Sequence, residues 1–490
     1  MAPTHRRRRL RVAIIGAGFG GLAAAVKLRQ RTAAEFTIFE QAPGLGGTWW
    51  ANRYPGCEVD VHSHAYSFSF LKYEWRRTHA TQPELLAYAE HVADVFGLRE
   101  HLRLNTRVTR LAWDDAARKY RLSTEGGEEL EFDVVICALG LLSVPRYPGW
   151  PGLDSFRGPC FHTSQWEDEH DLSGRTVAIV GTGSTAAQIV PAIAPRVGRL
   201  LVYQREPGWI EPKNERAFTA RELWFYRNVP LAQRAHRTWL FYQAMRRFKG
   251  LDVGTTRQRR MRELCVDFVN RTIEDPETRA AVTPQYPWGC KRPVIASTFY
   301  SALTRPNVEL VPHAVTAVTE DALVDASGTK RQADVLILST GFQPTRFLGG
   351  VEVEGRDGRS IHDVWAKRSS AFLGITVAGF PNLFILYGPN TNGGLSIIAQ
   401  LERQAEVAAR AVARLERGGV RSVDTRPEAQ RRYVEWIDRQ LGKHASAMES
   451  GCNNYYHGPD GANVTQWPRT HLAYAVATRV FARFGLRGRA

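Results

Sequence analysis

Two glycine-rich loops, each placed directly after a short hydrophobic run, constrain the fold of this chain more than any other feature. The first run and its loop read VAIIGAGFGG over residues 12–21, and the second read VAIVGTGSTA over residues 177–186. This pattern is typical of a buried parallel strand, a tight turn and a helix whose N-terminus faces a pyrophosphate. Two such loops in one chain predict an α/β fold with two Rossmann-like dinucleotide-binding domains.

The small residues of each loop have separate tasks. The first glycine permits the turn, the second lets a pyrophosphate approach the backbone, and a small third residue lets the helix pack closely on its strand. The candidates for binding the phosphates or shaping the loops are Gly16, Gly18 and Gly21 in the first loop and Gly181, Gly183 and Ser184 in the second.

The residues that end the next hydrophobic run distinguish the two sites. Glu40 follows the run 36–39 and would accept hydrogen bonds from ribose hydroxyls while repelling a 2′-phosphate, which suits FAD or NAD. Arg205 follows the run 200–204, and a guanidinium there suits the 2′-phosphate of NADPH. The plainer interpretation of Arg205 is a solvated surface arginine.

Two further motifs give the chain a family resemblance. Residues 156–166 read FRGPCFHTSQW and match the pattern Phe-x-Gly-x-x-x-His-x-x-x-Trp, and residues 46–60 read GGTWWANRYPGCEVD. With these motifs the chain resembles the class B flavoprotein monooxygenases of the Baeyer–Villiger type, which use FAD and NADPH. Trp166 favours this branch over the enzymes that oxidise nitrogen and sulfur, although His162 and Trp166 fit a purely structural role at the hinge between domains equally well.

The resemblance also implies catalytic residues and a reaction. Cys290 to Pro293 read CKRP, so Arg292 would be the mobile catalytic arginine, Lys291 would help to hold the 2′-phosphate, and Asp60 would hold Arg292 in position. The reaction would insert one oxygen atom of O2 into a ketone through a flavin C4a-peroxide, giving an ester or lactone. Further cofactor contacts would come from Gly47, Thr48, Trp49, Asp60, Val108 and Asn390.

Two other functions stay open at this point. A heteroatom oxygenase of the same class would act on amines or thioethers, and Baeyer–Villiger enzymes often oxidise sulfides too. An NADPH-driven flavin oxidase or reductase would oxygenate no organic substrate.

The resemblance also predicts the order of domains along the chain. We expect the FAD-binding domain in two parts, the NADPH-binding domain in two parts, and a helical insert between the latter. The predicted boundaries are 10–142 and 343–490 for FAD, 153–209 and 287–342 for NADPH, and 210–286 for the insert. Local patterns predict a capping box at residues 81–84 and a long helix from about Ser396 to Arg417.

Composition narrows the remaining possibilities. No run of 18 apolar residues occurs, so we expect no stable membrane insertion. The six cysteines form no Cys-x-x-Cys pair, which argues against a redox dithiol, a disulfide framework and a metal site, and favours the cytoplasm. The net charge is +16, but no nucleic-acid motif is present, so the expected partners are a small ketone and O2, in a monomer or homodimer.

Overall fold

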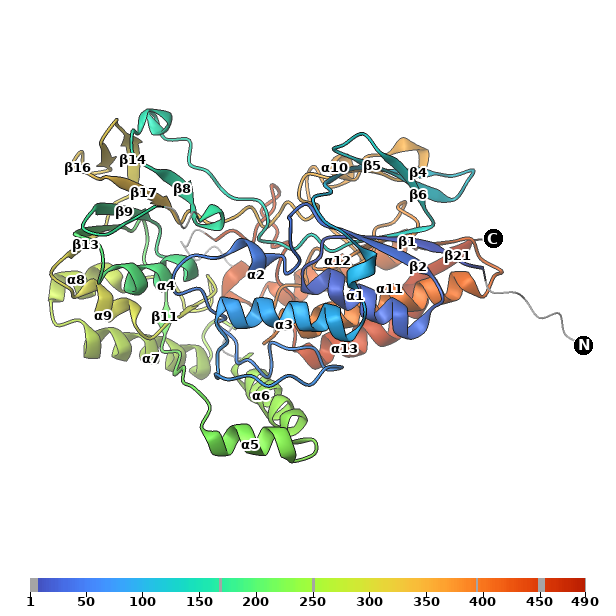
Figure 1. Cartoon of the computed structure of the whole chain (residues 1–490), viewed down its shortest axis with the longest axis horizontal. Helices are drawn as coiled ribbons and strands as arrows, with labels where there is room; N and C mark the ends of the chain where they lie inside the picture. The colour runs from blue at the N-terminus through green and yellow to red at the C-terminus, as the bar shows by residue number, and fades with distance from the viewer. Residues whose placement is uncertain (1–7, 167–169, 249–251, 394, 448–453, 490) are drawn as a thin grey trace, which may run out of the picture.

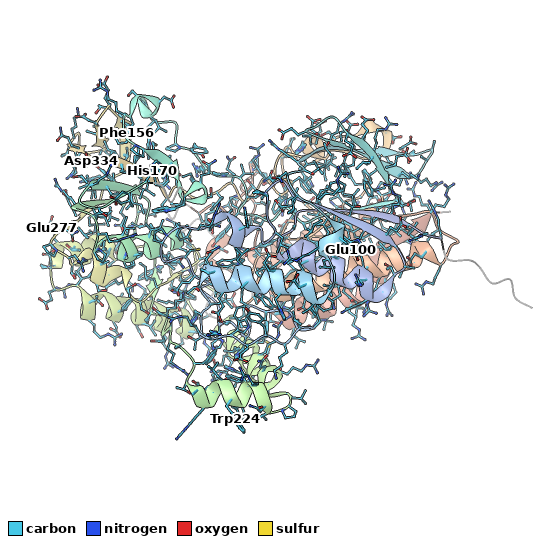
Figure 2. The ribbon with its side chains drawn as sticks, viewed as in Figure 1. Glu100, Phe156, His170, Trp224, Glu277 and Asp334 are labelled. Atoms are coloured by element: carbon cyan, nitrogen blue, oxygen red, sulfur yellow. The ribbon has the colours of Figure 1, made fainter. Side chains whose placement is uncertain are left out.

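A computed structural model describes residues 8–166, 170–248, 252–393, 395–447 and 454–489. The described chain is an α/β protein with two lobes, each built on a five-stranded parallel sheet (Figure 1). Figure 2 marks the lobes: Glu100 lies on that of the first sheet, and Phe156 and Asp334 lie on that of the second. This is the fold class that the two glycine loops predict.

The first sheet contains the first glycine loop at the end of its central strand. Its order is β19-β7-β1-β2-β3, and every pairing is parallel. The bounds are β1 Arg11–Ile15, β2 Glu35–Phe39, β3 Leu102–Arg103, β7 Val134–Cys137 and β19 Leu383–Ile385.

Both faces of the first sheet are covered. Val12 and Ile14 pack into the same core as α1 (Phe19–Arg31) and α11 (Ile397–Glu416), whereas Ala13 and Ile15 face a mixed sheet in which only the β18–β4 pairing is parallel. Successive side chains of a strand point to opposite faces, so a strand buried on both sides is apolar throughout. That sheet has the order β18-β4-β5-β6, with β4 Val108–Asp114, β5 Lys119–Thr124, β6 Glu129–Phe132 and β18 Glu352–Glu354.

The second sheet repeats this plan around the second glycine loop. Its order is β13-β10-β9-β17-β8, again with parallel pairing throughout. Val177 and Ile179 pack toward α4 (Ser184–Ile193), and Ala178 and Val180 toward a small antiparallel sheet. The bounds are β8 Cys160–His162, β9 Thr176–Val180, β10 Arg199–Tyr203, β13 Val308–Val311 and β17 Val335–Leu338, and for the small sheet β14 Val315–Val318, β15 Ala322–Asp325 and β16 Lys330–Gln332.

The segment between β10 and β13 is largely helical and projects below the two sheets (Figure 1). Figure 2 places Trp224, on the first of these helices, at the lower edge of the molecule. The helices are α5 Ala220–Asn228, α6 Ala232–Phe248, α7 Thr256–Thr272, α8 Pro276–Val282 and α9 Phe299–Leu303, and a short strand pair joins β11 Ile210–Glu211 to β12 Val294–Ile295.

The remaining α-helices and β-strands of the described residues complete the first lobe. No helix among the described residues is long and apolar enough to cross a membrane. The elements are α2 Thr48–Ala51, α3 Gln82–Val95, α10 Ile361–Val364, α12 Pro427–Leu441, α13 His471–Val480 and α14 Ala482–Gly485, with the strand pair β20 Ser422–Thr425 and β21 Leu486–Arg489.

Two local expectations are wrong. Helix α3 begins after Thr81 as predicted, but its capping box does not form, because Glu84 instead accepts a hydrogen bond from the Arg76 backbone N–H at 2.8 Å. A capping box forms instead at the start of α5. There the Thr219 hydroxyl accepts a hydrogen bond from the Glu222 backbone N–H, and the Glu222 carboxylate accepts one from the Thr219 backbone N–H. In addition, Cys290 is disulfide-bonded, which the cysteine spacing did not indicate.

Candidate functional site

A cleft of about 1270 Å³ runs between the two lobes and the helical segment. It reaches the first glycine loop at one side and the start of α4 at the other, with the segments 57–62 and 288–293 between them. A cleft that touches both dinucleotide loops is where ligands bind in paired Rossmann-like domains. Of the predicted site residues, those lining it are Gly16, Gly18, Glu40, Gly47, Thr48, Trp49, Asp60, Val108, Ser184, Lys291 and Arg292.

The first loop has the geometry of a pyrophosphate cradle. Gly16 has a φ of +101°, and a Cβ on Gly21 would lie 1.9 Å from the Gly16 carbonyl oxygen, so both positions require glycine. A Cβ on Gly18 would meet only Gly47, at 3.4 Å, so its backbone faces open space. The carboxylate of Glu40 accepts hydrogen bonds from the Ala17 and Ala42 backbone N–H groups, at 2.8 and 2.9 Å, which fixes it beside this space.

The second loop is built in the same way but is more open. Gly181 has a φ of +112°, and a Cβ there would lie 2.3 Å from the Ser339 carbonyl oxygen. A Cβ on Gly183 would meet nothing within 4 Å. Gly183 and Ser184 are both exposed, so the N-terminus of α4, where backbone N–H groups lack helical partners, is open to solvent. An anion can approach the backbone at this point without displacing a side chain.

Arg292 and Asp60 meet inside the cleft, although they come from distant parts of the sequence. Nη2 of Arg292 donates to Oδ2 of Asp60 at 2.5 Å, and the backbone N–H of Arg292 donates to the Tyr456 hydroxyl at 2.7 Å. The negative charge of Asp60 raises the pKa of Arg292 above its usual range. The Arg292 side chain is 48% exposed, so its guanidinium is held at one end and still open to the cleft.

The two cations predicted for the 2′-phosphate have different surroundings. Arg205 is exposed just beyond β10, and the structure gives its side chain no ion pair with a described residue. Lys291 forms an ion pair with the carboxylate of Glu206 and lies 5.0 Å from the centre of the Tyr286 ring. A bound phosphate would therefore compete with Glu206 for Lys291.

The structure places other predicted residues outside the cleft lining. Asn390 is buried, and its amide donates to the carbonyl oxygens of Asn463 and Gln466 at 2.8 and 3.2 Å, so its side chain ties two segments together. Gly21, Gly181, Gly183 and Arg205 also do not line the cleft, and a role for any of these five in cofactor binding stays a prediction. Trp49 lines the cleft but is buried, and its indole N–H donates to the Tyr66 hydroxyl at 3.3 Å.

His162 has a clear structural contact. It is fully buried, and its Nε2–H donates to the Gly341 carbonyl at 2.9 Å while Nδ1 contacts the Ser164 hydroxyl at 2.8 Å. Burial lowers the pKa of His162, so its ring is neutral. These contacts hold the start of the second lobe against the segment after β17, which favours the hinge interpretation of this motif.

The sequence did not reveal a second ion pair in the cleft, whose lysine is buried. Nζ of Lys213 lies 2.6 Å from Oε1 of Glu58, and the Lys213 side chain is only 1% exposed. Gln188 of α4 joins the same region, because its amide donates to the Glu58 carbonyl at 2.9 Å. A Cβ on Gly56 would lie 2.6 Å from the Gln188 carbonyl oxygen, so the glycine of the Tyr-Pro-Gly motif allows the two lobes to touch. No local pattern in the sequence marks Lys213 or Gln188.

Comparison with known proteins identifies the family. A Baeyer–Villiger monooxygenase of Pseudomonas aeruginosa is 39% identical over 97% of this chain and 90% of its own length. A Baeyer–Villiger monooxygenase of Streptomyces coelicolor is 40% identical over 96% of this chain and 91% of its own. The chain belongs to the Baeyer–Villiger monooxygenase family.

Further comparisons agree with this assignment. The crystal structure of cyclohexanone monooxygenase from Rhodococcus sp. Phi1 bound to NADP+ superposes with a TM-score of 0.89 at 29% identity, covering 99% of this chain and 100% of that one. Residues 10–199 match the family described as Pyridine nucleotide-disulphide oxidoreductase. For a Baeyer–Villiger monooxygenase, the paired Arg292 and Asp60 in a cleft between two dinucleotide loops are therefore the main candidates for the catalytic centre.

Proposed function

We infer that this protein is an FAD-dependent, NADPH-consuming monooxygenase that inserts one oxygen atom of O2 into a ketone and so forms an ester or lactone. The observation that carries this function is the Arg292–Asp60 ion pair, which lies in the same cleft as the first glycine loop and Ser184 of the second. A half-exposed guanidinium fixed by a carboxylate is suited to stabilising negative charge that develops on a small substrate.

The residues of the first loop fit FAD. The space beside Gly18 accepts a pyrophosphate, and the ordered Glu40 carboxylate retains lone pairs for ribose hydroxyls. Bound FAD would supply the redox chemistry by which O2 is activated. We propose that Gly47, Thr48 and Val108, which line the same side of the cleft, contact this cofactor.

The second loop fits NADPH. We propose that the open backbone at Gly183 and the N-terminus of α4 bind its pyrophosphate, and that Arg205 and Lys291 bind its 2′-phosphate. Lys291 would exchange its partner Glu206 for the phosphate. The cost of parting this ion pair is the reason to expect Arg205, which has no such competitor, to contribute more to affinity.

Arg292 would act on the substrate. We propose that its guanidinium donates to the ketone oxygen and stabilises the negative charge that develops there as oxygen is inserted. Asp60 would act as a positioning residue, because its carboxylate holds one end of the guanidinium and leaves the other end free. The backbone bond from Arg292 to Tyr456 anchors the loop behind it.

Product analysis tests the function. The purified protein, loaded with FAD, is incubated with NADPH, ¹⁸O2 and a panel of linear, cyclic, aryl and polycyclic ketones, and also with a thioether. We expect esters or lactones that contain one ¹⁸O atom. Sulfoxide as the sole product would instead identify a heteroatom oxygenase, and quantitative hydrogen peroxide without organic product would identify an oxidase.

A further inference from the structure

Three histidines meet at the boundary between the first lobe and the helical segment. His62 and His64 lie on the loop that follows Asp60, and His236 lies on α6. Nδ1 of His64 is 3.2 Å from Nδ1 of His236, and one ring nitrogen from each of the three histidines lies within 4.8 Å of the other two. Sequence spacing did not suggest this cluster, because its third member is far from the other two along the chain.

The backbone around the cluster is fixed. The Ser63 N–H donates to the Thr78 carbonyl at 2.8 Å, and the Ala65 N–H donates to the His62 carbonyl at 2.8 Å, which closes a tight turn around His64. The side chain of Arg237 donates to the Ser67 carbonyl of the same loop at 2.6 Å. Since Arg237 follows His236 on α6, this bond holds His236 against the loop.

One ring nitrogen of the cluster, Nδ1 of His236, has two hydrogen-bonding neighbours but can satisfy only one of them. Nδ1 of His236 lies 3.2 Å from His64 Nδ1 and 2.7 Å from the Tyr226 hydroxyl. A neutral ring nitrogen has either one lone pair or one N–H, so it satisfies only one of these neighbours well. A cation placed among the rings would accept the lone pairs of His64 and His236 together.

We propose that His62, His64 and His236 bind a divalent transition-metal ion, with Zn²⁺ as the ion that fits best. Zn–N bonds of about 2.0–2.1 Å and tetrahedral angles separate two ligand nitrogens by roughly 3.3–3.4 Å. The separation of 3.2 Å between His64 and His236 is already close to this value, whereas His62 has to move inward. The fourth position would hold water or an anion, with the Tyr226 hydroxyl beside it.

The ligand type and the nearby charges indicate which class of ion the cluster would bind. The three ligands are all imidazoles, which favour Zn²⁺, Cu²⁺ or Ni²⁺ over Mg²⁺ and Ca²⁺. Arg237 and Arg216 oppose a cation, although Glu222 neutralises Arg216 through two bonds of 2.8 and 2.6 Å.

The position of the three histidines gives the ion a path from solvent and predicts what its binding would stabilise. His62 lines the large cleft, so an ion can reach the cluster from it. The bound ion would link α6 to the loop that begins two residues after Asp60. It would therefore stabilise the boundary between the helical segment and the lobe that carries the positioning carboxylate.

The test uses the FAD-loaded protein after dialysis against a chelator. Zn²⁺ is titrated by calorimetry, the bound metal is counted by mass spectrometry, and thermal unfolding is followed with and without Zn²⁺. We expect one Zn²⁺ per chain and a higher Tm with the metal. His236→Ala should weaken binding at least roughly tenfold, which is the lower bound even for loss of an outer-shell partner.

A second ligand variant and a control variant complete the test. His62→Gln removes a ligand that is only half-buried, so it tests the site if His236→Ala fails to fold. His313→Ala removes an exposed histidine of the second lobe and should bind Zn²⁺ like the wild type. A wild type that binds no stoichiometric Zn²⁺, or equal binding by all four proteins, would overturn the proposal.

Discussion

Replacing Arg292 with alanine separates the chemistry of oxygen insertion from folding and cofactor binding. The Arg292–Asp60 bond joins a guanidinium that is 48% exposed to a carboxylate that is 21% exposed. Ion pairs this accessible contribute only about 0–1 kcal/mol to stability, so Arg292→Ala should fold and keep FAD. Loss of one donor to a developing oxyanion costs far more, about 2.7–4 kcal/mol or 10²–10³ in turnover. The effect on catalysis should therefore greatly exceed the effect on stability.

The assay measures ester formed, NADPH consumed and hydrogen peroxide released in the same reaction. We expect Arg292→Ala to consume NADPH while making peroxide in place of ester. Arg292→Lys keeps the charge but loses the planar fork, so it should recover only part of the activity. Asp60→Ala should show a milder form of the same uncoupling, and Arg305→Ala, an exposed control, should show none. Ester formation by Arg292→Ala at near the wild-type rate would refute the role of this residue.

Three further outcomes can be measured on single variants. Arg205→Ala should raise the KM for NADPH far more than that for NADH, and equal use of both nicotinamides by the wild type would contradict the assignment of the second loop. Gly18→Val should fold, because its Cβ meets only Gly47 at 3.4 Å, yet purify without yellow flavin. Burial and two arginines lower the pKa of His471 from 6.5 to about 4. Between pH 6.5 and pH 4 the unfolded chain therefore binds a proton at this histidine that the folded chain does not. The free energy of unfolding should thus fall as the pH drops from about 6.5 to 4. The urea midpoint of His471→Asn should fall less over this range than that of the wild type.

The strands, the loops and one long helix were predictable because their determinants are local. Runs such as 12–15 and 177–180 are apolar at every position, as a strand buried on both faces requires, and the glycine loop that follows each run marks the strand end. Helix α11 begins after Ser396 and ends before Arg417, as its pattern predicts. The capping box predicted at Thr81 does not form, because the Glu84 carboxylate accepts a hydrogen bond from the Arg76 backbone N–H instead. Arg76 lies outside the four-residue pattern, so the pattern could not predict this contact.

The sequence by itself determined the α/β class and the two phosphate loops, and its family resemblance implied Arg292 and Asp60 as candidates. The class and the loops follow from residue types at short spacing, where backbone geometry limits the possible structures. The tertiary structure contains the contact between Arg292 and Asp60 that the resemblance implied, and it alone decided that Lys291 pairs with Glu206 and that His236 reaches His64. These pairs join segments far apart in the chain, and their distances depend on how two sheets and the helices between them pack, which no short pattern records.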